Sequence, residues 1–143
     1  MTLSNTQPCP HCGRYNNRAV SIDAVIIQSD KVLLIKRGKD PFKGHWALPG
    51  GFVEWDETTE DSVAREVLEE TGLKVESCTL IGVYSSPKRH PQQVINVAYT
   101  VQATGQPRAG DDALEFQWCS INTLPELLAF DHREIILDAL KKK

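Results

Sequence analysis

The chain has 143 residues and a mass of 16.0 kDa, which suits one compact domain and is too little for two separately cored ones. With 41% hydrophobic and 24% charged residues, the composition is that of an ordinary globular protein rather than a fibrous or disordered one. The longest aliphatic runs are only four residues, which excludes a membrane-spanning helix. Because residues 1–8 lack a basic start and an apolar stretch, we expect no signal peptide and a cytoplasmic location.

The charge is unevenly distributed along the chain. Residues 54–70 contain eight acids and one base, while the rest of the chain contains 15 bases and 11 acids. No dominant basic stripe is present, so we expect no nucleic-acid partner. An acidic cluster in a mildly basic body favours a site that gathers divalent cations and then an anionic ligand.

The first predicted elements follow a polar arm at residues 1–18. Residues 19–28 and 31–37 are aliphatic or β-branched, and the turn-forming pair Ser29-Asp30 separates them, so a β-hairpin is predicted. The domain proper is expected to occupy residues 19–143.

The clearest predicted helix covers residues 59–71. Thr58 is the expected N-cap, Asp61 stands where a capping box needs an acceptor, and Gly72 is the expected stop. On a helical wheel, Glu66, Glu69 and Glu70 fall within about 100° of arc. The opposite face is aliphatic and is expected to pack inward: Val63, Ala64, Val67 and Leu68.

The remaining pattern predicts an α/β domain with many strands and two principal helices. A second helix is expected at residues 131–141, with Asp131 and Glu134 forming a capping box and an apolar face at Ile135, Ile136, Ala139 and Leu140. The other predicted elements are strands at 79–84, 94–104 and 115–121 and a helical turn at 125–129.

Crowded carboxylates on one helix face predict a cation site. In a partly enclosed cleft, close like charges cost several kcal/mol, and Arg65 can offset only part of this through Glu69. Because oxygen ligands without His or Cys suit hard cations, Mg²⁺ or Mn²⁺ is expected rather than Zn²⁺. The alternative interpretation is a solvated acidic helix face.

The same residues resemble a known family. Gly51, then Glu57, then the run Arg65-Glu66-Val67-Leu68-Glu69-Glu70-Thr71-Gly72-Leu73 matches the 23-residue Nudix box, from Gly51 to Leu73, at every specified position. Asp56 departs from the Gly that many members carry there, at a position the box does not specify. The resemblance implies the Nudix fold, an α/β/α sandwich with a mixed central sheet.

The resemblance also implies a pyrophosphohydrolase and assigns roles to residues. It makes Glu66, Glu69, Glu70 and the Gly50 carbonyl metal ligands, Arg65 the residue that orients the glutamates, and Glu57 an auxiliary ligand. The general base differs among members, and a box glutamate, Asp111, Asp112 and Glu115 all remain candidates here. Asp112 and Glu115 are also candidate metal ligands.

The segment after the box resembles the ADP-ribose pyrophosphatase branch. Pro87 stands fourteen residues beyond Leu73, and Tyr84, Arg89 and His90 are candidate substrate-binding residues near it. The resemblance implies cleavage of ADP-ribose or an ADP-sugar to AMP and a sugar phosphate, by an enzyme that is often a homodimer. Two alternatives stay open: a housecleaning nucleoside triphosphate pyrophosphatase, and a sensor that binds ADP-ribose without cleaving it.

Four cysteines complete the candidate residues. Cys9 and Cys12 form a Cys-x-x-Cys that resembles a zinc knuckle, but zinc needs four ligands, so a second chain or distant residues would have to contribute. A reduced remnant without metal is the alternative. Cys78 and Cys119 lie in or beside predicted strands and are expected to behave as small hydrophobic residues.

Overall fold

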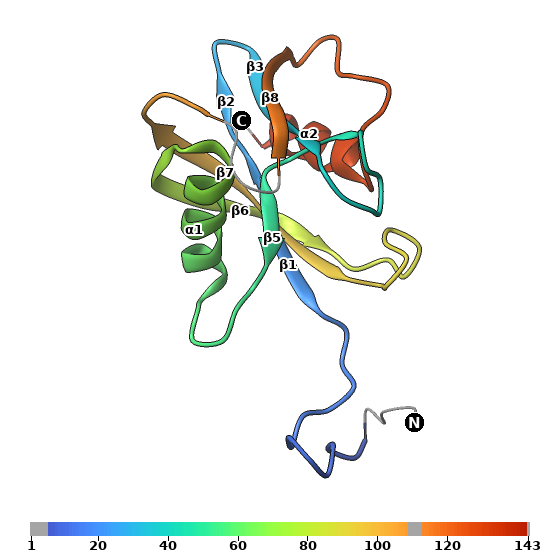
Figure 1. Ribbon diagram of the computed structural model, residues 1–143. Helices are drawn as coiled ribbons and strands as arrows, with labels where there is room; N and C mark the ends of the chain where they lie inside the picture. Colours follow the sequence, from blue (N-terminus) through green and yellow to red (C-terminus); the bar gives the residue numbers. More distant parts are fainter. Residues whose placement is uncertain (1–5, 109–112, 143) are drawn as a thin grey trace.

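The computed structural model describes residues 6–108 and 113–142. In these residues the elements follow one another as shown in Figure 1: β1 (Val20–Val25), β2 (Ile27–Gln28), β3 (Lys31–Arg37), β4 (Trp46–Ala47), β5 (Gly50–Phe52), α1 (Thr59–Thr71), β6 (Lys74–Tyr84), β7 (Ile95–Thr104), β8 (Ala113–Ser120) and α2 (His132–Lys141).

The strands form two sheets. The first has the order β5-β1-β7-β6, in which β1 runs parallel to β7 and the other pairs are antiparallel. In the second sheet β3 is central and pairs antiparallel with β2, β4 and β8. The first sheet is therefore the predicted mixed sheet.

The two helices cover opposite faces of the first sheet. Alternate residues of a strand face opposite sides, and on β1 Ile22 and Ala24 pack in one core with α1. Val25 packs in a second core with Ile135 and other α2 residues. This arrangement confirms the predicted α/β/α sandwich, with the second sheet beside it.

The predicted hairpin is present only at its tip. Ser29 and Asp30 adopt left-handed φ values of 49° and 61°, and they join β2 to β3 as expected. However, the first predicted strand breaks after Val25. Residues 20–25 belong to the first sheet because β1 lies between β5 and β7, where its aliphatic side chains are buried on both faces.

Helix α1 begins and ends as predicted, but it is rotated relative to the expected packing. Thr58 and Asp61 form the capping box, and Gly72 ends the helix with a φ of 76°. Ala64 is exposed and Leu68 is 53% exposed, so the predicted inward face was wrong at these two positions. The helix packs against β5 as well as β1 and β6, and this contact brings the other flank inward. The buried residues are Ser62, Val63, Val67, Glu70 and Thr71.

Two predictions near the C-terminus were wrong. Residues 125–129 form no helical turn, because Leu128 pairs with Trp46 in an extended bridge. Helix α2 covers the predicted residues, but Asp131 makes no side-chain cap. Its carboxylate instead accepts hydrogen bonds from Arg89 on the β6–β7 loop.

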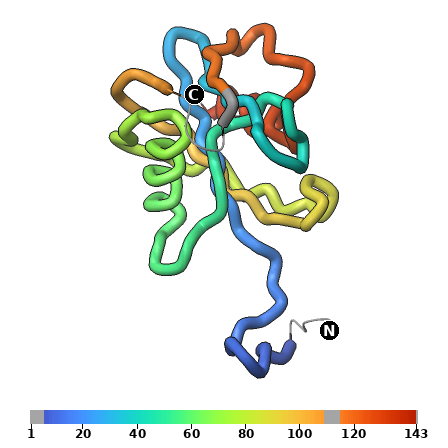
Figure 2. Tube along the Cα trace, in the orientation of Figure 1, coloured from blue at the N-terminus to red at the C-terminus, as the bar shows by residue number. Residues whose placement is uncertain are grey.

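The N-terminal arm extends away from the rest of the chain, as Figure 2 shows. Its described part contacts the domain where the Arg14 guanidinium lies 4.7 Å from the ring centroid of Trp55, on the β5–α1 loop. Among the described residues, no helix is long and apolar enough to cross a membrane.

Candidate active site

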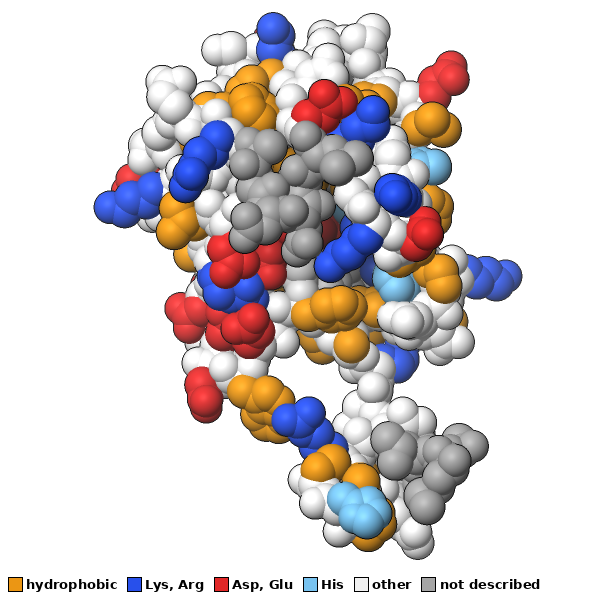
Figure 3. Space-filling model, in the orientation of Figure 1, with side chains coloured by type: hydrophobic (Ala, Val, Ile, Leu, Met, Phe, Trp, Pro, Cys, Tyr) orange, Lys and Arg blue, Asp and Glu red, His pale blue; other side chains and the backbone are white. Residues whose placement is uncertain are grey.

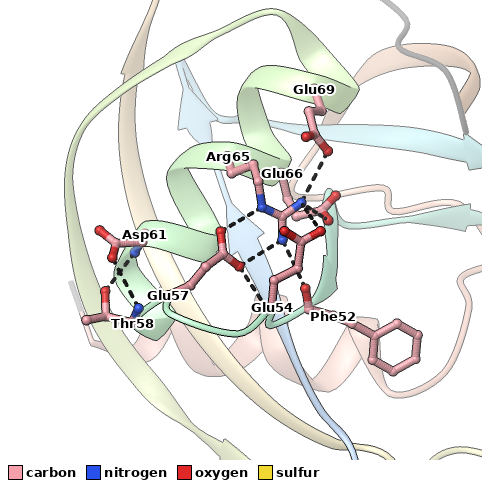
Figure 4. Close-up of polar contacts among 8 residues, drawn as sticks. All are labelled: Phe52, Glu54, Glu57, Thr58, Asp61, Arg65, Glu66 and Glu69. Atoms are coloured by element: carbon pink, nitrogen blue, oxygen red, sulfur yellow. Dashed lines mark hydrogen bonds and ion pairs between the residues drawn. The ribbon is translucent and has the colours of Figure 1, made fainter.

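Arg65 is the centre of an ionic network on α1, drawn in Figure 4. Its Nε and Nη2 atoms donate to the two carboxylate oxygens of Glu57 at 2.7 and 3.0 Å. Its Nη1 donates to Glu66 at 2.7 Å and to Glu69 at 3.2 Å, and Nη2 also donates to the Phe52 carbonyl. The hydrogen bonds from Arg65 lower the pKa of Glu57 to about 2, so Glu57 stays ionised.

Glu70 is in a different environment from the other box glutamates. It is only 8% exposed, and its Oε2 accepts a 3.4 Å hydrogen bond from the Gly50 amide. Burial raises its pKa to about 9, and the negative charges of Glu66 and then Asp23 act in the same direction. Without a cation nearby, Glu70 therefore holds a proton at neutral pH.

The Gly50-Gly51 pair lets the backbone approach these carboxylates. A Cβ atom on Gly51 would overlap the carboxylate of Glu66, and one on Gly50 would overlap the Ile22 carbonyl and the Asp23 carboxylate. Any other residue type at either position would displace β5 or the acids. The strand, the turn and the helix are thus fitted to one another at this point.

A cleft of about 430 Å³ opens beside this network. We call Asp23, Glu54, Glu66 and Glu70 its acidic side, and Arg37, Lys39, Arg89 and His90, which have the single acid Asp40 among them, its basic side. Figure 3 shows acidic side chains gathered over α1 and basic side chains across the same face. The cleft thus offers oxygen ligands for a cation and positive charge for an anion.

Asp23 and His132 were missed by the sequence analysis. Both are buried, and His132 Nε2 lies 2.9 Å from Asp23 Oδ2 while its Nδ1 accepts a 3.0 Å hydrogen bond from the Leu48 amide. That bond leaves the imidazole proton of the neutral ring on Nε2, the nitrogen that lies near Asp23. An acid inside an otherwise aliphatic strand is the signal that could have found Asp23.

Arg37 and Phe130 form another part of the cleft without a local sequence signal. The Arg37 guanidinium lies 5.1 Å from the Phe130 ring centroid, and its Nε donates to the Pro41 carbonyl at 2.7 Å. Burial lowers the pKa of Arg37, and Asp23 and Glu70 partly offset this. The Phe130 ring thus borders a half-buried cation.

The candidate substrate residues have different surroundings. Arg89 lines the cleft, but its side chain is only 3% exposed and is held by Asp131 at 2.9 and 2.7 Å. His90 also lines the cleft and stacks on Phe130 at 4.9 Å between ring centroids. Arg89 therefore connects the β6–β7 loop, which also carries His90, to the start of α2.

Tyr84 and Pro87 are not brought to the cleft among the residues that the structure describes. The Tyr84 hydroxyl donates to Asp138 at 2.6 Å, and its ring packs against the core beside α2. Burial and then the Asp138 contact raise the pKa of this hydroxyl. Pro87 is exposed on the β6–β7 loop.

Comparison with known proteins decides the family. The profile described as NUDIX domain matches residues 17–139. The chain belongs to the Nudix family. The resemblance read from residues 51–73 is thus confirmed, and with it the prediction of a Nudix hydrolase.

Two Nudix relatives have names that describe different activities. An ADP-ribose pyrophosphatase from Methanocaldococcus jannaschii is 49% identical over 131 residues, which cover 90% of this chain and 77% of the relative. A putative 8-oxo-dGTP diphosphatase from Bacillus subtilis is 34% identical over 80% of this chain and 74% of its own.

Solved structures agree with this assignment of the fold. A MutT/nudix family protein from Enterococcus faecalis superposes with a TM-score of 0.80 at 35% identity, covering 96% of this chain and 65% of that one. The chain thus spans slightly less than two thirds of that structure. The NUDIX domain of Shewanella oneidensis NrtR, solved with ADP ribose, has a TM-score of 0.79 at 26% identity over 90% of both chains.

The candidate metal ligands of this Nudix chain are only partly assembled. Glu66 and Glu70 line the cleft together with Gly50, whereas Glu69 and Glu115 are exposed and outside the lining of the described residues. Glu115 pairs with Lys36 at 3.5 Å. Across residues 6–108 and 113–142, no three His, Cys, Asp or Glu side chains are grouped to hold a metal. Asp111 and Asp112 lie outside the described residues.

The cysteines are all free thiols. Cys9 and Cys12 lie on a turn closed by the Gly13 amide, which donates to the Cys9 carbonyl at 2.8 Å. Backbone hydrogen bonds from His11 and then Cys12 lower the pKa of the Cys9 thiol. No zinc site is formed within the described residues. Cys119 is buried and Cys78 half-buried, in accord with their expected packing role.

Proposed function

We propose that the protein hydrolyses ADP-ribose, or a closely related ADP-sugar, to AMP and a sugar phosphate with the help of Mg²⁺ or Mn²⁺. The observation that carries this proposal is the cleft, which joins an acidic side to a basic side within about 430 Å³. A diphosphate that binds together with a cation needs both sides: carboxylates for the cation and positive charge for the phosphates. The M. jannaschii relative and the ADP-ribose complex of the S. oneidensis domain support the choice of substrate.

The acidic side fits a hard divalent cation. Glu70 is buried beside Glu66 and Asp23, and these surroundings raise its pKa to about 9, so a cation would take the place of its proton. Glu66, Glu69, Glu70 and the Gly50 carbonyl would hold the ion. When bound, it lowers the pKa of a water molecule and neutralises phosphate oxygens.

Arg65 and Glu57 would set the positions of these ligands. Arg65 already holds Glu66 and Glu69, and Glu57 fixes Arg65 through two hydrogen bonds. Turning Glu69 toward the cleft would require exchange of its 3.2 Å bond to Arg65, which is long enough to be weak. Arg65 is thus a positioning residue in this proposal.

The basic side would bind the phosphates. The Arg37 guanidinium is half-buried and lines the cleft near Asp23 and Glu70, and its fork of donors suits phosphate oxygens. His90 lines the same cleft, and burial and then the charges of Arg89 and Arg37 lower the pKa of its imidazole, which favours the neutral ring. Arg89 is occupied by Asp131 and would act by holding His90 in place.

In the proposed reaction, the oxygen of a water molecule forms a bond to one phosphorus and the bond from that phosphorus to the bridging oxygen breaks. A carboxylate takes the proton of the water, and the two products leave as AMP and a sugar phosphate. A box glutamate, Asp111, Asp112 and Glu115 remain the candidate bases. The exposed position of Glu115 and its pairing with Lys36 make Glu115 the weakest of them.

Nucleoside triphosphate hydrolysis is the second candidate function, because of the B. subtilis relative. A substrate panel separates the two: ADP-ribose, NADH, and normal and oxidised nucleoside triphosphates, each with Mg²⁺ and again with EDTA. We expect turnover of ADP-ribose that EDTA abolishes. Turnover of triphosphates alone would contradict the substrate, and binding of ADP-ribose without turnover would indicate a sensor.

We also propose that residues 1–18 form an arm separate from a Nudix domain at residues 19–143. Cys9 and Cys12 would supply two zinc ligands, and a second copy of the chain would supply the others. Elemental analysis of protein purified without added zinc tests this, with one zinc per two chains expected and none contradicting it. Sedimentation would test the associated homodimer, and no nucleic-acid partner is proposed.

A further inference from the structure

Three cleft residues form a row across the end of the first sheet. Ser21 on β1 is the register partner of Phe52 on β5 and of Asn96 on β7. Register partners in a sheet point to the same face, and all three residues line the cleft. The next row toward the acidic side contains Gly50 and Asp23. The Phe52–Ser21–Asn96 row is therefore cleft floor that the proposed cation and phosphate contacts do not use.

Asn96 is the polar residue of this row that has an unused acceptor. Asn96 is only 2% exposed, and its Nδ2 donates a hydrogen bond to Ser21 Oγ at 2.8 Å. Its Oδ1 is buried and has no hydrogen-bond partner among the described residues. A buried acceptor left unpaired loses its hydrogen bond to water without gaining another, so native structures rarely keep one without a reason. A donor on a ligand would remove that cost.

Phe52 supplies an aromatic surface at the other end of the row. It is 52% exposed, which is unusual for a phenylalanine in a sheet, and Figure 4 shows its ring turned away from α1. With strands about 4.8 Å apart, the Cα atoms of Phe52 and Asn96 are separated by about 10 Å across Ser21. A separation of this size has room for one planar heterocycle above Ser21, with the edge of the heterocycle toward Asn96.

The row also lies at a suitable distance from the acidic side. Ser21 and Asp23 are two residues apart on β1, which corresponds to about 7 Å along the strand. A nucleoside places one sugar between its base and its first phosphate, so a base over Ser21 would direct that phosphate toward Asp23, Glu66 and Glu70.

We propose that the Phe52–Ser21–Asn96 row is the nucleobase subsite, where Phe52 contacts the ring and Asn96 Oδ1 accepts a hydrogen bond from an exocyclic amino group, such as that of adenine. This assignment rests on the proposed function, since it takes the substrate to be a nucleoside diphosphate derivative. It makes Asn96 a specificity-determining residue that rejects bases with a carbonyl at the same position.

The experiment compares ADP-ribose with its hypoxanthine analogue, in which a carbonyl replaces the amino group. For the unaltered protein we expect kcat/KM to be at least tenfold higher for ADP-ribose. In N96A the value for ADP-ribose should fall about tenfold, mainly through KM, and the value for the analogue should stay within twofold. F52A should weaken both substrates, and F52L should do so less.

Gln102→Ala, at an exposed position of the same strand, is the matched control and should change neither substrate. Thermal denaturation checks that the variants fold, and binding of AMP against IMP by calorimetry repeats the comparison without turnover. An equal effect of N96A on both bases, or none on either, would overturn the subsite even if ADP-ribose is hydrolysed. Failure to hydrolyse either substrate would instead overturn the proposed function, and the AMP and IMP measurements would still decide the subsite.

Discussion

The two sides of the cleft are built in different ways. The acidic side draws Glu54, Glu66 and Glu70 from one stretch of 17 residues and adds Asp23 from β1, and Arg65 makes its contacts within 13 positions of itself. The basic side depends on Arg89 and Asp131, which are 42 positions apart, and on Arg37 from a third segment. Local geometry in and before α1 arranges most of the first side, whereas contacts between segments far apart in the sequence arrange the second.

This contrast has an electrostatic counterpart. On the acidic side the charges are like and close, so burial raises the pKa of Glu70 to about 9. On the basic side the buried cation Arg89 is paired with Asp131 at 2.7 Å. The ionised acidic side therefore needs a cation to be stable. On the basic side, Asp131 already neutralises Arg89, and we call this pair the anchor of the basic side.

The largest effect is expected on the acidic side from E70Q. The amide keeps the shape of the side chain but removes the ligand charge, so kcat with Mg²⁺ should fall by about 100-fold or more. E60Q on the same helix is the control, since its amide oxygen can still accept from the Tyr99 hydroxyl. Steady-state kinetics gives the answer, and retained activity in E70Q would exclude Glu70 as a ligand.

The next effect concerns the anchor of the basic side. D131N removes the charge that Arg89 faces, so the free energy of unfolding should drop by about 2 kcal/mol, because the buried Arg89 guanidinium loses its counter-charge. Urea denaturation measures the loss. E134Q, at an exposed position of α2, serves as its control and should change little.

If the anchor also positions His90, D131N should raise KM severalfold with a smaller change in kcat. A drop in stability with unaltered KM would mean that the anchor supports the fold but not the cleft, and the contrast between the two sides would lose its functional meaning.

R37A tests the basic side directly. Loss of the guanidinium should raise KM for ADP-ribose about tenfold, which corresponds to about 1.4 kcal/mol of phosphate binding. R37K should recover only part of this, since an ammonium lacks the planar fork of donors. A fall in kcat at constant KM would instead indicate that Arg37 acts on the reacting atoms.

The last effect is the pH dependence of stability in EDTA, which is measured apart from catalysis. Because the pKa of Glu70 is raised to about 9 in the folded protein, the folded state holds a proton that the unfolded state loses above about pH 4.5. Stability from this group therefore falls as pH rises from about 4.5 to 9, by on the order of 1 kcal/mol per pH unit. E70Q should remove this slope in denaturation series at pH 6, 7 and 8, and an unchanged slope would contradict the buried protonated state.

The sequence predicted best where neighbours along the chain decide the structure. Thr58, Asp61 and Gly72 set the limits of α1 through hydrogen bonds within a few residues, and these limits were confirmed. The face of α1 that is buried was predicted less well, because Ala64 and Leu68 are exposed while Glu70 is buried. A helical wheel gives relative angles only, and the contact with β5 sets the absolute rotation.

The sequence by itself determined the family, the position of the carboxylate helix and the match of residues Gly51 to Leu73 to the Nudix box, since these depend on spacing within one short segment. Only the tertiary structure decided that Asp23 and His132 meet, that Asp131 holds Arg89 instead of capping α2, and that Phe52, Ser21 and Asn96 share one row. Those contacts depend on which strands become neighbours, and strand order follows from burial of the whole chain rather than from any local pattern.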